Sequence, residues 1–221
     1  MISTHNLSSL PNIDALKKLL QSMAMLDAIL MPEWTYRYYS FNAHWSKNEQ
    51  MGSMRNGSGD DFYALFNEAG CFLKGFVHDA PIIPYRDQSP QIFPNILENV
   101  PAAFEECLHE PAFKMTDTTF CIWRRYSDNN WQQDKMKLQS GNDFDGSMSL
   151  LSPLDGSPKT YKIWAEEYYE RSVNLKAITA IYTHTTLSQE LIDMLNDDLS
   201  LDDLQKDCDE IGYPSTSIIV A

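Results

Sequence analysis

The pattern of apolar and polar positions predicts a helix near the start of the chain. Between positions 12 and 30, apolar side chains recur at steps of three and four residues: Ile13, Leu16, Leu19, Leu20, Met23, Leu26 and Leu30. Asn12 stands where an N-cap is expected, and Pro32 ends the pattern. The segment therefore predicts an amphipathic helix with one buried face. The next segment, 34–41, is aromatic and alternating, which predicts a strand.

The middle of the chain predicts an antiparallel meander. Short apolar or alternating runs occupy residues 51–55, 61–66 and 71–77, and turn sequences at 56–59 and 67–70 separate them. Glycine adopts the positive φ that tight hairpins require, so Asn-Gly and Ala-Gly between such runs indicate hairpin turns. We therefore expect neighbouring antiparallel strands joined at 56–59.

The segment after the meander predicts less regular structure. Four prolines within residues 79–94 each lack a backbone donor, which indicates a long surface crossover without helix or strand. A helix is expected at 102–108, a strand at 118–124 and a weaker partner strand at 131–138. The stretch 140–147 is polar and rich in Gly and Asp, which predicts a loop.

The last third of the chain predicts three helices and one strand. Pro158 suits the first turn of a helix that extends to about residue 171. Residues 175–182 are β-branched and continuously apolar, which indicates a buried strand. Residues 188–211 are typical of two helices joined near position 199, the second of them capped by Ser200.

Domain organisation follows from length and uniformity. The chain has 221 residues and shows no internal repeat, low-complexity linker or break in composition. We expect a single domain over 1–221, with 1–11 and 215–221 as flexible tails. The predicted class is α+β, with a mainly antiparallel sheet around 34–77 and 118–138 that is packed by helices and followed by a helical C-terminus.

Composition restricts the possible functions. Seventeen Lys and Arg against 31 Asp and Glu give a formal net charge of −14, which disfavours nucleic-acid binding. The sequence shows no signal peptide and no apolar run long enough to cross a membrane. The four cysteines form no CxxC pair, so we expect reduced thiols packed in the core and a cytoplasmic protein.

Acidic residues gather in the two C-terminal helices. Between positions 188 and 211, nine carboxylates stand against a single basic residue, Lys206: Glu190, Asp193, Asp197, Asp198, Asp202, Asp203, Asp207, Asp209 and Glu210. Such a run is most often a solvated face. It is also what a docking surface for a basic protein partner would carry, with Asp197, Asp198, Asp202 and Asp203 as the expected contact residues.

The meander offers a second candidate site. Arg55 and Asp60 flank the predicted turn, and His78 follows the last predicted strand, so the three could form a ligand pocket with Asp79 beside the imidazole. The glycine-rich stretch 55–61 lacks the Gly-Lys-Ser/Thr sequence of a phosphate loop. Residues 142–146 fail the calcium-loop pattern at its first and last ligands. We therefore expect no metal and no cofactor.

Five short segments of the chain resemble known sequences. Residues 38–42, 53–60, 74–76, 118–123 and 210–214 resemble a group of uncharacterised bacterial proteins that are soluble and single-domain. That resemblance implies a bacterial, cytoplasmic setting and assigns no functional residues. In size, acidity and α+β composition the chain is also similar to the immunity proteins that neutralise bacterial toxins. The leading hypothesis is an acidic binding protein, such as an immunity-type inhibitor of a basic toxin, and the alternative is a small-molecule enzyme or ligand-binding domain.

Overall fold

The computed structural model describes residues 1–85, 91–134 and 143–216. The predicted opening helix is confirmed as α1 (Ile13–Leu30), which begins where Asn12 Oδ1 accepts a hydrogen bond from the Ala15 amide at 3.0 Å. At the other end, Arg37 donates to the carbonyl oxygens of Met31 and Pro32, just past the last turn. A cation in this position satisfies free carbonyl groups and offsets the negative end of the helix dipole.

The predicted meander is confirmed and forms the centre of the fold. Five antiparallel strands follow one another in chain order: β1 (Tyr39–Ser46), β2 (Glu49–Arg55), β3 (Asp61–Asn67), β4 (Gly70–Phe76) and β5 (Phe120–Arg125). The turn between β2 and β3 is held by Asn56, whose Oδ1 accepts from the amides of Ser58 and Asp60. Gly57 and Gly59 adopt positive φ there, as the sequence predicts.

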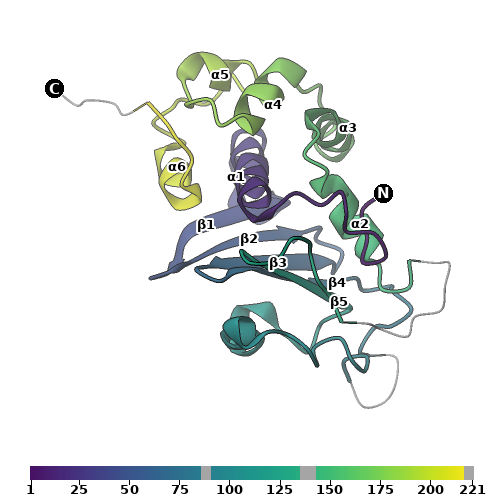
Figure 1. Ribbon diagram of the computed structural model, residues 1–221. Coiled ribbons are helices and arrows are strands. Elements are labelled where there is room, and N and C mark those ends of the chain that lie inside the picture. The colour runs from purple at the N-terminus through teal and green to yellow at the C-terminus, as the bar shows by residue number, and fades with distance from the viewer. Residues whose placement is uncertain (86–90, 135–142, 217–221) are drawn as a thin grey trace.

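Helices cover one face of the sheet, which we call the helical face (Figure 1). Helix α1 lies across it and is flanked by the helices of the C-terminal half: α2 (Ser147–Leu151), α3 (Pro158–Tyr168), α4 (Leu175–Tyr182), α5 (Gln189–Asp193) and α6 (Gln205–Ile211). A short 3₁₀ turn, η4 (Ser152–Leu154), continues α2. The class is therefore α+β, with a helical C-terminus.

The other face, here called the irregular face, is covered by the chain between β4 and β5 (Figure 1). Its regular elements in the described residues are two 3₁₀ helices, η2 (Ala102–His109) and η3 (Pro111–Phe113). Strand β3 shows the division between the two faces. Phe62 and Phe66 contribute to the core under the helices, and Leu65 contributes to the core on the opposite side.

Two predicted strands are wrong in whole or in part. Residues 34–41 begin as a 3₁₀ helix, η1 (Trp34–Tyr36), and only the last three belong to β1. The buried Asp27 carboxylate fixes the bend, because it accepts from the backbone amides of Tyr38 and Tyr39 at 3.0 and 2.7 Å. Residues 175–182 are helix α4, capped by Asn174 and buried at the helical spacing of Ala177, Ile178 and Ile181.

Other boundaries also differ from the predictions. The helix at 102–108 is of the 3₁₀ type, and the predicted partner strand at 131–138 makes a single bridge, between Gln132 and Trp123; positions 135–138 lie outside the described residues. The second acidic helix begins at Gln205 because Ser200 and Asp203 form a turn ahead of it. Within the proline-rich crossover, Ile82 is buried and not on the surface.

The N-terminal segment is packed against the fold and does not extend from it. Ile2 and Leu10 are buried, and Thr4 is tied to the loop before α2. The Thr4 hydroxyl donates to Asp145 Oδ2 at 2.6 Å, and its amide donates to Ser147 Oγ at 3.0 Å. The Asp145 carboxylate, which lies in the 142–146 stretch compared above with a calcium loop, is therefore used in hydrogen bonds within the protein. At the other end Ser215 bridges to Leu187, and 217–221 lie outside the described residues.

Candidate functional site

The structure brings two of the three predicted pocket residues together. Asp60 Oδ1 accepts from the backbone amide of His78 at 2.8 Å and lies 2.7 Å from His78 Nδ1. Asn56 Nδ2 holds the other carboxylate oxygen at 2.7 Å. The hydrogen bond and charge of Asp60 raise the pKa of His78, whose side chain is 48% exposed. The carboxylate that orients the imidazole is therefore Asp60 and not the neighbouring Asp79.

Arg55 is directed elsewhere. Its guanidinium carbon stands 3.8 Å from the centroid of the Trp34 indole, and Nη2 donates to the Trp34 carbonyl oxygen at 3.0 Å. This cation–π contact joins β2 to the 3₁₀ helix η1. The cavities beside Trp123, beside Arg37 and at the β1–β2 turn are lined by other described residues, and none of their linings includes Arg55, Asp60 or His78.

The four aspartates predicted as partner contacts are all exposed. Asp203 accepts from the Ser200 hydroxyl at 2.6 Å and from the Ser200 amide at 2.9 Å; these hydrogen bonds lower the pKa of Asp203 and fix the turn between α5 and α6. Together with their exposed neighbours they make a continuous acidic segment of chain. We call it the acidic surface and define it as Glu190, Asp193, Asp197, Asp198, Asp202, Asp203, Asp209 and Glu210.

The acidic surface adjoins the C-terminal end of α1. Asn196 Nδ2 donates to the Ile29 carbonyl oxygen at 2.8 Å, which anchors the turn that carries Asp197 and Asp198. Arg37, which caps the same end of α1, is only 7% exposed and forms a bidentate ion pair with Asp207 of α6. The negative end of the helix dipole therefore lies beside the exposed carboxylates.

Two exposed aromatic side chains belong to η1, and one of them, Trp34, borders this charge. Trp34 and Tyr36 of η1 are 53% and 57% exposed, although aromatic rings are usually more covered. Trp34 lines the same small hollow as Arg37, Asp207 and Glu210. The sequence does not reveal this arrangement, because its alternating pattern predicts a strand over both rings, where one face would be buried.

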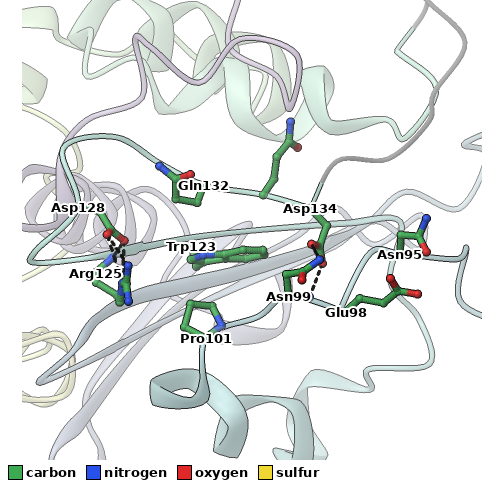
Figure 2. Close-up of a pocket in the computed structure, with 10 residues that line it drawn as sticks. Asn95, Glu98, Asn99, Pro101, Trp123, Arg125, Asp128, Gln132 and Asp134 are labelled. Atoms are coloured by element: carbon green, nitrogen blue, oxygen red, sulfur yellow. Dashed lines mark hydrogen bonds and ion pairs between the residues drawn. The ribbon is translucent and has the colours of Figure 1, made fainter.

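A larger cavity lies on the irregular face, above Trp123 of β5 (Figure 2). Its volume is about 790 Å³, within the range of small-molecule sites. Its walls are mostly amides and charged groups, contributed by the segment before η2, by β5 and by the turn that follows β5: Asn95, Glu98, Asn99, Pro101, Trp123, Arg125, Asp128, Gln132, Gln133 and Asp134.

Hydrogen bonds fix the side chains of this cavity in pairs. Arg125 donates to Asp128 from Nε and Nη2, the latter at 2.9 Å. Asp134, 5% exposed, accepts from the Asn99 amide at 3.0 Å and from Asn99 Nδ2 at 2.6 Å. Figure 2 shows the two pairs on either side of the Trp123 indole.

The third pair of the cavity involves an unusual backbone. Asn95 adopts φ 70°. With its side-chain amide nitrogen turned toward Glu98, it donates to Glu98 Oε1 at 2.7 Å. Asn tolerates this left-handed conformation better than most residues. The cavity has no signal in the sequence, because its residues come from three separate segments and share no motif spacing.

The described residues offer neither a metal site nor an exposed thiol. They contain no group of three or more His, Cys, Asp or Glu placed to hold a metal ion. All four cysteines are buried and free, and burial raises the pKa of Cys71 and Cys121. Within the same residues, no helix is both long enough and apolar enough to cross a membrane.

Comparison of the chain with protein-family models, with curated proteins and with solved structures gives no match. Any function therefore has to be argued from the geometry and chemistry of the sites themselves.

Proposed function

We propose that this chain is an acidic binding protein whose docking surface consists of the acidic surface and the adjoining rings of Trp34 and Tyr36. The partner is a basic protein, and an immunity-type inhibitor of a basic bacterial toxin is the specific form that we favour. The observation that carries the proposal is the position of a half-exposed Trp34 in the same hollow as Glu210 of α6.

The two parts of this surface serve different steps of binding. Clustered exposed carboxylates attract a basic partner over distances up to the Debye length, about 8 Å at physiological ionic strength, and so raise the association rate. Tryptophan and tyrosine supply large contact area at low entropic cost and dominate the binding energy of many interfaces. The buried Arg37–Asp207 pair holds η1 against α6, so the rings and the carboxylates are presented together.

The alternative, a small-molecule enzyme at Arg55, Asp60 and His78, has weaker support. The Asp60–His78 pair has the geometry of an oriented base. However, Arg55 packs on Trp34, and the described cavities lie elsewhere. Arg55 supports the docking surface instead, because it covers one side of the Trp34 indole and holds the ring in place.

The first experiment identifies a basic partner and measures its kinetics with two matched variants. The full chain is used to capture proteins from bacterial lysate at low salt, and the purified candidate is then tested by surface plasmon resonance. The test variant replaces Asp197, Asp198, Asp202 and Asp203 with Asn. The control replaces four exposed acids outside the acidic surface, as Glu68→Gln, Asp79→Asn, Glu105→Gln and Glu106→Gln. Each removes four carboxylates, so both change the formal charge from −14 to −10.

We expect the test variant to associate about tenfold more slowly at low salt, while the control stays near the wild-type rate. The difference should vanish at high salt because exposed charges are screened. Trp34→Ala should mainly shorten the lifetime of the complex, by about 30-fold for a central interface tryptophan. Equal slowing in the test and control variants, or a lifetime unchanged by Trp34→Ala, would show that this surface is only a solvated face.

A further inference from the structure

The cavity above Trp123 has both donors and acceptors to offer. The hydrogen bonds between described residues leave Arg125 Nη1 and one N–H of Asn99 as donors. They leave acceptors as well: Asn99 Oδ1, and Gln132 Oε1, because Gln132 uses only its Nε2, toward the Asn130 carbonyl oxygen at 3.1 Å. Both Glu98 oxygens lie near the Asn95 amide nitrogen, at 2.7 and 3.1 Å, and each has a second lone pair that can accept. The lining is therefore mixed, with donors and acceptors on neighbouring side chains.

This mixture selects among ligand classes. A phosphate or carboxylate only accepts hydrogen bonds and would face Glu98, Asp128 and Asp134, while the single guanidinium of the lining is already paired with Asp128. An ammonium ion only donates, so it would use the acceptors of the lining and none of the Arg125 and Asn99 donors. A hydroxyl group both donates and accepts, so a ligand with several neighbouring hydroxyls satisfies both kinds of group.

The floor of the cavity fits the same class. The 5% exposed Trp123 indole lies at the bottom of the cavity, and the Pro101 ring, drawn close to it in Figure 2, lines the cavity as well. Sugars carry hydroxyls at their edges and apolar C–H groups on their faces. Polar groups around an aromatic floor therefore match both features of such a ligand.

The cavity is also organised before any ligand arrives. The Arg125–Asp128, Asn99–Asp134 and Asn95–Glu98 pairs each hold a side chain in one orientation, and Asn95 adopts a positive φ to do so. Preorganised groups lose less entropy when a ligand binds. We propose that this cavity binds a neutral saccharide, a function separate from the docking surface and on the opposite face of the sheet.

The test uses the full chain and defined probes. Glucose, N-acetylglucosamine, cellobiose and maltotriose are titrated by saturation-transfer NMR and calorimetry, with spermidine and inorganic phosphate as cationic and anionic probes. Glu98→Ala and Gln132→Ala change exposed lining residues, so the fold is not at risk. Glu105→Ala is the matched control, because Glu105 is exposed on η2 and does not line the cavity.

We expect at least one saccharide to bind with a Kd below about 10 mM. Loss of a hydrogen bond should weaken saccharide binding about 3- to 10-fold in Gln132→Ala. In Glu98→Ala, where the lost acceptor is charged, the affinity should fall by about tenfold or more. Glu105→Ala should bind as the wild type does. Binding of spermidine or phosphate alone, no binding by any saccharide of the panel, or equal affinity in all three variants would each overturn the proposal.

Discussion

The two faces of the sheet are covered in different ways. On the helical face, segments from both ends of the chain supply amphipathic helices, and α1 alone spans 18 residues. On the irregular face, one continuous stretch between β4 and β5 supplies short 3₁₀ turns. Both faces nevertheless have a dry core, because Phe104 and Phe113 are as fully buried as Leu16 and Leu26. Regular secondary structure is one way to cover a sheet, and well-placed aromatic side chains on irregular backbone are another.

The faces also bury opposite charges. Under the helices, the carboxylate of Asp27 is fully buried and held by donors alone: two backbone amides and the Tyr161 hydroxyl at 2.6 Å. Burial raises its pKa to about 6, against the lowering effect of these hydrogen bonds. On the irregular face, the buried Lys74 ammonium lies 2.9 Å from Asp61 and donates to the Asp117 carbonyl oxygen at 2.7 Å.

The largest effect is expected when Phe104, a fully buried aromatic side chain of the irregular face, is removed. Phe104→Ala should lower the free energy of unfolding by about 3–5 kcal/mol, because it empties a fully buried site that irregular backbone cannot close. The measurement is urea denaturation, with hydrogen exchange of the amides in 102–113. Glu105→Gln, on the exposed side of the same turn, should stay within about 0.5 kcal/mol. A loss below about 1 kcal/mol in Phe104→Ala would mean that this face contributes little to stability.

The second test concerns the buried carboxylate under the helices. Because the folded-state pKa of Asp27 is about 6 and the unfolded value is 3.8, the folded state holds the proton more tightly. Its contribution is therefore most favourable below pH 4 and falls by about 3 kcal/mol in total as the pH rises through 6 to about 7. Asp27→Asn should lack this step. The check is the difference between wild type and variant in unfolding free energy from pH 4 to 8, and a constant difference contradicts the assignment.

The smallest expected effect is at the buried ammonium. Lys74→Met leaves the Asp61 carboxylate without its cation and the Asp117 carbonyl without a donor. Since Asp61 is 23% exposed, water offsets part of the loss, and we expect about 1–3 kcal/mol of destabilisation. The double variant Lys74→Met, Asp61→Asn should recover part of it in a double-mutant cycle. Additive losses would show that the pair is not coupled.

The sequence by itself determined the elements whose signals are local. The periodicity and Asn12 cap of α1 and the glycine turns of the meander act over a few residues, so their prediction succeeded. It also determined that the side chains of Asp197, Asp198 and their acidic neighbours are exposed to solvent, because a run of carboxylates cannot be buried without partners.

Tertiary structure decided the rest, because the deciding partners are distant in the chain. Residues 175–182 have strand-like composition, yet packing against α1 and α3 makes them helix α4. The bend at 34–38 depends on Asp27 of α1. Trp34 and Glu210 line one hollow, and Asn99 bonds to Asp134, across separations of 176 and 35 residues that no spacing pattern encodes. Both candidate binding sites arise from such long-range contacts, so neither could be assembled from the sequence alone.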